Sequence, residues 1–202
     1  GGGQLNGQAV NGHNIAREAA VPRSTVDAYF AVLTDTLLAH LLQAWRPGAK
    51  VRESTHPKFY WFDPGVARAA AGLHRDPPDR AWRGTALETM IYHELGVFNE
   101  TAGKHRAIFY YRTPSGVEID FVVETRKRQT GKEPHVVAIE VKLSPTWDRS
   151  WEKAMVDLAA QPGLKVDRCL GIYTGSRTYQ FERVQVLPVI EFLQALHSGD
   201  TF

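Results

Sequence analysis

"VVAIEVKLSP", residues 136–145, places an acid and a base inside a run that is otherwise apolar. Val, Ile and Leu dominate this short run, so it predicts a buried β-strand. Charged side chains are rarely buried without a partner, because taking an ion out of water costs several kcal/mol. Glu140 and Lys142 therefore need either a compensating neighbour or a function.

A second apolar run upstream, VEIDFVVET at residues 117–125, also carries charge on one face. Side chains alternate along a strand, so Glu118 and Asp120 share one face of their strand. By the same alternation, Glu140 and Lys142 share one face of theirs. If the two strands are neighbours in register, the side chains of Asp120, Glu140 and Lys142 converge on one point.

Two carboxylates and an ammonium around one point form a site for a hard divalent cation. Mg²⁺ (or Mn²⁺) is held by one or two carboxylates together with waters and phosphate oxygens. A lysine beside the metal can steady or deprotonate the attacking water. Asp120 and Glu140 are therefore the predicted metal ligands. The alternative that the spacing leaves open is a ladder of ion pairs on a solvated sheet face.

The elements around these strands predict an α/β (α+β) domain over residues 80–202. A helix at 79–101 comes before strands at 105–113, 117–125 and 135–143. A helix at 147–161, strands at 166–175 and 179–189 and a closing helix at 189–197 follow. The order α-β-β-β-α-β predicts a mixed sheet flanked by helices.

Residues 1–75 predict a separate domain, which ends before the polar turn DPPD at residues 76–79. Helices at 12–20 and 21–38 are joined by a tight turn, and strands at 38–45 and 57–62 follow, joined by a basic loop. A short helix at 63–72, with Asp63 as its cap, closes the domain. Two helices around a tight turn followed by a β-hairpin are typical of a winged helix-turn-helix.

In a helix-turn-helix, the start of the second helix reaches base edges while nearby groups contact phosphates. The candidate nucleic-acid-binding residues are Arg23, Ser24, Thr25, Arg17, Lys50 and Arg52. Winged helices serve equally as protein–protein modules, and Asp27 and Asp35 on the second helix argue against strong DNA binding. Both readings stay open.

Composition excludes several classes of protein. The formal net charge of +2 is too small for a protein that coats nucleic acid non-specifically. The single cysteine, Cys169, is typical of a reduced, cytoplasmic protein. No apolar run is long enough for a membrane span, and no P-loop motif is present.

The segments SGVEIDFVVE and VVAIEVKLS together resemble the PD-(D/E)XK nuclease superfamily. In that superfamily an Asp on one strand and a Glu-x-Lys on the next bind the metal within an αβββαβ, restriction-endonuclease-like core. The resemblance implies catalytic roles for Asp120, Glu140 and Lys142. It also implies that Glu88, on the preceding helix, completes the site, although it would otherwise be an ordinary solvated glutamate.

Two residues near these acids are expected to support the site. Glu118 is either a supporting acid or a surface residue, and we favour the supporting role. Arg112, on the strand before Asp120, either approaches a phosphate or pairs with an acid of the site. We favour the pairing.

Nearly the whole chain resembles the C-terminal half of bacterial and archaeal ATPases that join an AAA-type P-loop domain to a DUF4143 region. The segments that carry this resemblance are NIAREAAVPRSTVDAYFAVL, KFYWFDPGVARAAAG, FYYRTPSG, SGVEIDFVVE and AIEVKLS, in this order. Pro22 departs from the pattern, because such helices often begin with a serine cap. The resemblance implies that an ATPase domain precedes Gly1 and that this chain is a fragment.

The sequence therefore predicts a Mg²⁺-dependent phosphodiesterase acting on DNA, as one module of a larger ATPase. Two alternatives belong to other classes of function. The nuclease fold can serve as a non-cleaving module that docks DNA or protein for the ATPase, or the winged helix can act as a transcriptional regulator.

Overall fold

The computed structural model describes residues 5–46, 56–113 and 116–202. The chain folds into two compact units. The N-terminal unit comprises Gly1–Ala44 and Arg52–Met90, and the C-terminal unit comprises Trp45–Val51 and Ile91–Phe202. The units thus divide inside a long helix, α4 (Arg80–Thr101), which contributes residues to both.

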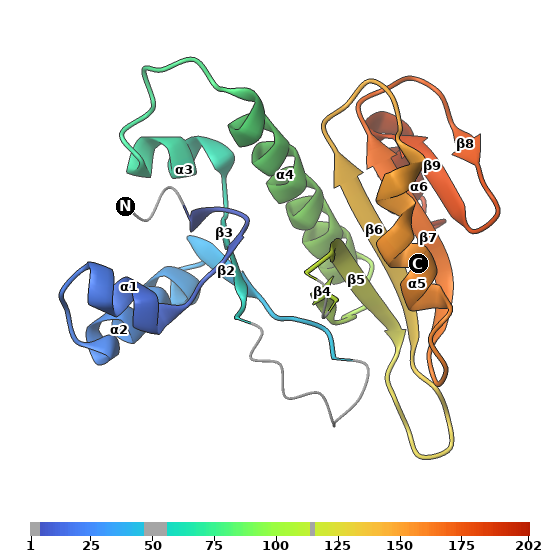
Figure 1. Cartoon of the computed structure of the whole chain (residues 1–202), viewed down its shortest axis with the longest axis horizontal. Coiled ribbons are helices and arrows are strands. Elements are labelled where there is room, and N and C mark those ends of the chain that lie inside the picture. The colour runs from blue at the N-terminus through green and yellow to red at the C-terminus, as the bar shows by residue number, and fades with distance from the viewer. Residues whose placement is uncertain (1–4, 47–55, 114–115) are drawn as a thin grey trace. The chain divides into compact units, whose positions relative to one another are not determined.

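The N-terminal unit combines short helices with a small sheet, drawn from blue to green in Figure 1. Within the described residues, its three strands form an antiparallel sheet in the order β1-β3-β2. Its elements before α4 are β1 (Gln8–Ala9), α1 (Gly12–Glu18), α2 (Arg23–Asp35), β2 (Ala39–Leu42), β3 (Lys58–Trp61) and α3 (Pro64–Ala70).

Capping residues set the starts of these helices. The Asn11 side chain accepts hydrogen bonds from the backbone N–H groups of His13 and Asn14, so Asn11 is the cap of α1. Asp63 caps α3 by accepting from Val66 N–H at 2.9 Å, as predicted. The sequence places Pro22 in the first turn of α2, but the structure places it immediately before that turn.

The C-terminal unit contains a mixed sheet, which has six strands within the described residues. The strand order is β4-β5-β6-β7-β9-β8, with parallel pairs β6–β7 and β7–β9 and antiparallel pairs elsewhere. The elements after α4 are β4 (Ile108–Arg112), β5 (Glu118–Arg126), β6 (His135–Lys142), a 3-10 turn (Arg149–Glu152), α5 (Lys153–Ala159), β7 (Lys165–Tyr173), β8 (Tyr179–Gln180), β9 (Val184–Pro188) and α6 (Val189–His197). The mixed α+β fold and the predicted order α-β-β-β-α-β are both present.

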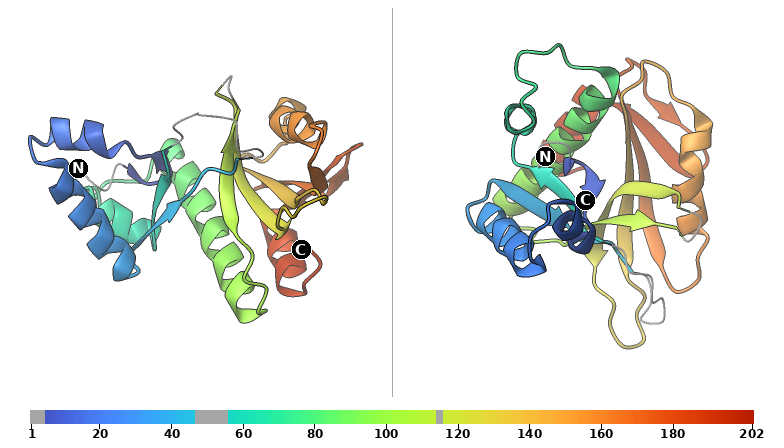
Figure 2. Two further views of the ribbon diagram at one scale, coloured as in Figure 1. Left: turned by 90° about the horizontal axis from the view of Figure 1, so that it is seen from below. Right: turned by 60° about the vertical axis from the view of Figure 1, so that its left-hand side comes forward.

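Helices cover both faces of this sheet, with α5 and α6 on opposite sides (Figure 2, left). Val136 and Ala138 of β6 belong to the apolar core that includes Met155 and Leu158 of α5. On the other face, the Tyr92 ring of α4 stacks on Phe121 of β5, with 5.7 Å between ring centroids. Burial on both faces explains why the central strands are nearly continuous apolar runs.

Two local predictions differ from the structure, and one short strand is missing from the predictions. Residues 179–189 are predicted as one strand, but they form two antiparallel strands, β8 and β9, because the chain reverses between Gln180 and Val184. The helix predicted from Trp147 begins later, with the 3-10 turn at Arg149. The short strand β1 carries no sequence pattern long enough to predict it.

Among the described residues, no helix combines the length and the apolar character that crossing a bilayer requires.

Candidate functional site

Strands β5 and β6 bring Asp120 and Glu140 together at one end of their antiparallel pairing. The register pairs Phe121 with Ile139, and Asp120 and Glu140 follow one residue beyond that pair. Each carboxylate accepts a backbone N–H from the opposite strand. Glu140 Oε2 accepts from Asp120 N–H at 3.4 Å, and Asp120 Oδ2 accepts from Val141 N–H at 2.8 Å. Both carboxylates therefore link the backbones of β5 and β6.

The two carboxylates are buried, and Lys142 reaches one of them. Asp120 and Glu140 are 8% and 6% exposed. Lys142 Nζ forms a close ion pair with Glu140 Oε1, while 30% of the lysine side chain remains exposed. The structure therefore brings together the three side chains that the strand alternation predicts to converge.

Burial first, and then the neighbouring negative charge of Asp120, raise the pKa of Glu140, which lies at about 8 instead of 4.5. The ion pair with Lys142 lowers the pKa of Glu140 but does not offset these two effects. Near neutral pH, Glu140 is therefore mostly protonated when no cation is bound. A cation beside both carboxylates would relieve their repulsion and favour the ionised form.

The donor set fits a hard cation that keeps most of its water. Within the described parts of the chain, no group of three or more His, Cys, Asp or Glu residues is placed to hold a metal. Two carboxylates are what Mg²⁺ commonly takes from a protein, with waters and substrate phosphate oxygens completing the octahedron. Asp120 and Glu140 would hold the ion, and Lys142 supplies a positive charge beside it.

Glu118 and Arg112 lie next to this site and pair with each other. They are register partners on β5 and β4, and Arg112 Nε lies 3.5 Å from Glu118 Oε1. Glu118 is two residues from Asp120 on the same strand. The pair places a positive and a negative group beside the carboxylates.

Glu88 lies in the N-terminal unit, on the part of α4 before Met90. Its Oε1 atom accepts a hydrogen bond from Tyr60 and lies 3.3 Å from Lys58 Nζ. The Lys58 side chain is only 5% exposed, so Glu88 compensates a buried charge on β3. A further role for Glu88 at the metal site stays a prediction.

Gly171 and the Trp147 ring lie next to Glu140, and this contact was not predicted from the sequence. Gly171 of β7 is the parallel register partner of Glu140, and the Trp147 ring lies against it. A Cβ atom at position 171 would come within 2.5 Å of that ring. A glycine inside the apolar run RCLGIY was the available signal, because glycine in a strand often marks a close approach.

The predicted nucleic-acid-binding residues are mostly exposed. Arg23 pairs with Asp27 within α2 at 2.8 Å, and Arg17 donates to Asn14 at 3.2 Å. Ser24 is exposed and Thr25 is half-buried. The predictions for Lys50 and Arg52 fall outside the described residues.

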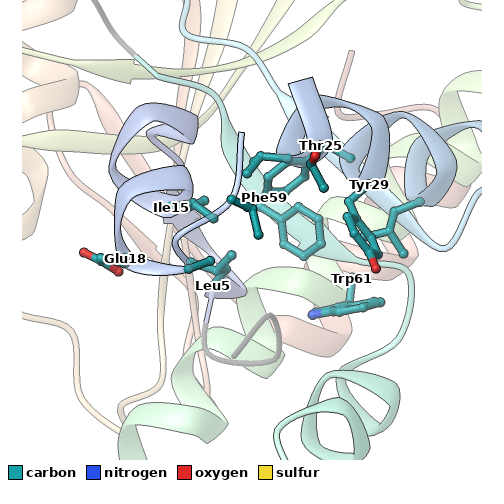
Figure 3. Close-up of a pocket in the computed structure, with 12 residues that line it drawn as sticks. Leu5, Ile15, Glu18, Thr25, Tyr29, Phe59 and Trp61 are labelled. Atoms are coloured by element: carbon teal, nitrogen blue, oxygen red, sulfur yellow. The ribbon is translucent and has the colours of Figure 1, made fainter. Parts of the chain in front are cut away.

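Thr25 also lines an apolar pocket of about 620 Å³ in the N-terminal unit. In Figure 3 the aromatic rings of Tyr29, Phe59 and Trp61 surround this pocket, and the carboxylate of Glu18 points away from them. A lining of this kind offers few groups for a phosphate or a metal. The carboxylates on β5 and β6, and not this apolar pocket, are therefore the candidate site for a metal.

The fold and the site define an α+β protein with a buried pair of carboxylates on its larger sheet. The chain belongs to the family described as a domain of unknown function, DUF4143, whose model matches residues 83–192. A second model, for the domain of unknown function DUF8612, matches residues 3–77.

Two curated relatives extend this comparison. The uncharacterized proteins Mb2031c of Mycobacterium bovis and Rv2008c of Mycobacterium tuberculosis are each 29% identical to the chain over 160 residues. The alignment covers 76% of this chain and 33% of each relative, so the chain spans about a third of the length of the curated relatives it matches. No solved structure matches the chain significantly.

Proposed function

We propose that the chain is a Mg²⁺-dependent phosphodiesterase module that acts on DNA within a larger P-loop ATPase. The observation that carries the proposal is the contact of Asp120, Glu140 and Lys142 at the buried end of two neighbouring strands. The alternative is a ladder of ion pairs on a solvated sheet face, and such a ladder would leave both acids exposed. Their burial therefore favours a site.

In this proposal the N-terminal unit is a winged helix-turn-helix and the C-terminal unit is a restriction-endonuclease-like domain. The succession of α1, α2, β2 and β3 supports the first assignment, and that of α4, β4, β5, β6, α5 and β7 supports the second. The length of the relatives is consistent with a further domain, which we propose is the ATPase.

The proposed chemistry assigns one task to each side chain. The bound cation supplies Lewis-acid stabilisation of the charge that develops on the phosphate oxygens. Asp120 and Glu140 hold the cation in the ionised form. Lys142 remains partly exposed beside Glu140; as the ammonium it orients the attacking water, and as the neutral amine it accepts the proton of that water.

A cleavage assay with matched variants tests the proposal. The chain is incubated with duplex, single-stranded and branched DNA in Mg²⁺ or Mn²⁺. We expect cleavage that Lys142→Ala reduces by about 100-fold or more, the usual range for general acid–base groups. Asp120→Asn should also reduce cleavage strongly, because it removes a charge that holds the cation. The controls are Asp157→Asn and Lys153→Ala, because these residues form an exposed ion pair on α5.

Absence of cleavage by the wild type on all three substrates would overturn the proposal, as would equal activity in the Asp120 variant and its control. A docking module for the ATPase would instead bind DNA or protein equally well with Asp120→Asn. The exposed apolar side chains of α2, with Tyr29 70% and Val32 59% exposed, favour that second candidate. A regulator would bind a specific sequence, and Arg23→Ala would weaken that binding.

A further inference from the structure

A pocket in the C-terminal unit lies away from Asp120 and Glu140. Its volume is about 310 Å³, and its lining includes Arg106, Thr125, Val137, Arg168 and Phe202. Val137 is three residues from Glu140 on β6, so the two side chains point to opposite faces of the sheet. Thr125 is at the opposite end of β5 from the carboxylates.

Two β-bulges shape this pocket, one on each neighbour of β6. On β5 the register passes from Glu124↔Val136 to Arg126↔His135, which leaves Thr125 as the extra residue. On β7 it passes from Val136↔Val166 to Val137↔Arg168, which leaves Asp167 extra. The two extra residues meet, because Thr125 Oγ1 donates to Asp167 Oδ2 at 2.9 Å. Bulges redirect side chains and are frequent beside binding sites.

Two guanidinium groups line the pocket without an ion-pair partner in the described chain. The hydrogen-bond acceptors of Arg168 are neutral: the carbonyl oxygens of Asp200 and Thr201 and Oε1 of Gln185. Arg106 stacks over the Phe202 ring at 5.4 Å, and its Nη1 is buried without a hydrogen-bond acceptor among the described residues. A buried donor left unsatisfied costs about 1–3 kcal/mol. Because this Nη1 atom is closed to solvent, an anion in the pocket would meet the other atoms of the Arg106 guanidinium group.

The carboxylates of the two acids in the lining, Asp167 and Asp200, have partners other than these arginines. The Asp167 carboxylate lies 3.0 Å from His135 Nδ1 and 3.6 Å from Lys165 Nζ, in addition to its bond with Thr125. The other lining acid, Asp200, accepts from the Ser198 hydroxyl. The pocket therefore presents two guanidinium groups together with the carboxylates of Asp167 and Asp200, and the guanidinium groups are the part of the lining that can bind an anion.

We propose that this pocket binds the phosphate group of a small phosphorylated molecule through Arg106 and Arg168. The planar guanidinium group matches phosphate oxygens with two parallel hydrogen bonds. The volume falls within the range of about 300–1,000 Å³ that small-molecule sites occupy, which leaves room for the body that carries the phosphate. The proposal does not depend on nuclease activity at Asp120 and Glu140.

Titration with inorganic phosphate, followed by two-dimensional NMR at constant ionic strength, tests the proposal. We expect saturable shifts centred on the residues that line the pocket. Arg106→Gln should weaken binding by about tenfold or more, because it removes a charge-assisted donor worth roughly 1.5–3 kcal/mol. The substitution breaks no hydrogen bond of Nη1 but removes the stacking over Phe202, so thermal unfolding of the variant checks that the fold is retained. The matched control is Arg183→Gln, which removes an exposed arginine outside the pocket.

Equal phosphate affinity in the wild type, Arg106→Gln and Arg183→Gln would overturn the proposal. So would shifts that never saturate, or saturation by acetate where phosphate gives none. Loss of binding in Arg106→Gln alone, with Arg183→Gln unchanged, supports it.

Discussion

At the scale of single residues, Glu140 carries the greatest electrostatic cost in the candidate site. It is buried beside a second carboxylate, and its one cationic neighbour, Lys142, is partly exposed. The raised pKa follows from that placement. When no cation is bound, Glu140 stays protonated near neutral pH, and this removes the electrostatic cost of a buried negative charge.

The pKa of Glu140 makes the metal-free fold depend on pH. A carboxyl group whose pKa is higher in the folded state stabilises the fold fully below its unfolded pKa, near 4.5, and loses this contribution as the pH rises toward 8. Each pKa unit corresponds to about 1.4 kcal/mol, so the effect amounts to a few kcal/mol. Glu140→Gln cannot ionise, and we expect a flatter dependence of its unfolding free energy on pH.

Urea unfolding of the metal-free protein at about pH 5 and about pH 8 measures this difference. The control is Glu191→Gln, which alters an exposed carboxylate at the start of α6. The explanation fails if Glu140→Gln loses as much stability between the two pH values as the wild type does.

At the scale of elements, the sequence predicts β5 and β6 well because strand alternation and a buried core impose the same register. The meeting of Asp120 with Glu140 then follows from antiparallel pairing. Bulges carry no comparable signal, so the pocket at Thr125 and Asp167 could not be predicted. The contact of Trp147 with Gly171 could not be predicted either. Trp147 lies in the irregular start of the connection between β6 and β7, where the sequence has no periodic pattern.

The packing of Trp147 on β7 yields a prediction about that strand. Gly171→Ala adds a Cβ within 2.5 Å of the Trp147 ring, so the ring must move. Overpacking of this kind costs roughly 1–3 kcal/mol. We expect thermal unfolding at a lower temperature and a change in tryptophan fluorescence.

The matched control is Gly96→Ala in the middle of α4, where an added Cβ meets nothing within 4 Å. Alanine is favoured over glycine inside a helix by roughly 0.5–1 kcal/mol, so this variant should be slightly more stable than the wild type. Equal stability of the two variants would contradict the close approach at Gly171.

At the scale of the whole molecule, the sequence predicts two regions but does not indicate how their residues are shared. Trp45 is the last residue of a strand predicted for the first region, yet it belongs to the C-terminal unit. It is 6% exposed, its ring packs edge-on against Tyr111, and its N–H donates to Tyr110 O at 2.6 Å. Apolar periodicity identifies Trp45 as a core residue but does not say of which core.

This assignment predicts where a truncation of Trp45 acts. Trp45→Ala should destabilise the C-terminal unit by about 3–5 kcal/mol, the usual cost of removing a buried tryptophan. Hydrogen exchange should show the loss of protection in β4 and β5, with the amides of α1 and α2 little affected. Loss of protection confined to the helices α1 and α2 would contradict the assignment of Trp45 to the core of the C-terminal unit.

Binding of Mn²⁺ shows directly whether Asp120 and Glu140 hold a divalent cation. Electron paramagnetic resonance of the purified chain counts the bound ions in the wild type, in Asp120→Asn and in the control Asp157→Asn. We expect one bound ion in the wild type and in the control. We also expect an affinity about tenfold or more lower in Asp120→Asn, because a buried metal-binding charge is removed. Equal Mn²⁺ binding by Asp120→Asn and Asp157→Asn, or no binding by the wild type, would contradict this expectation.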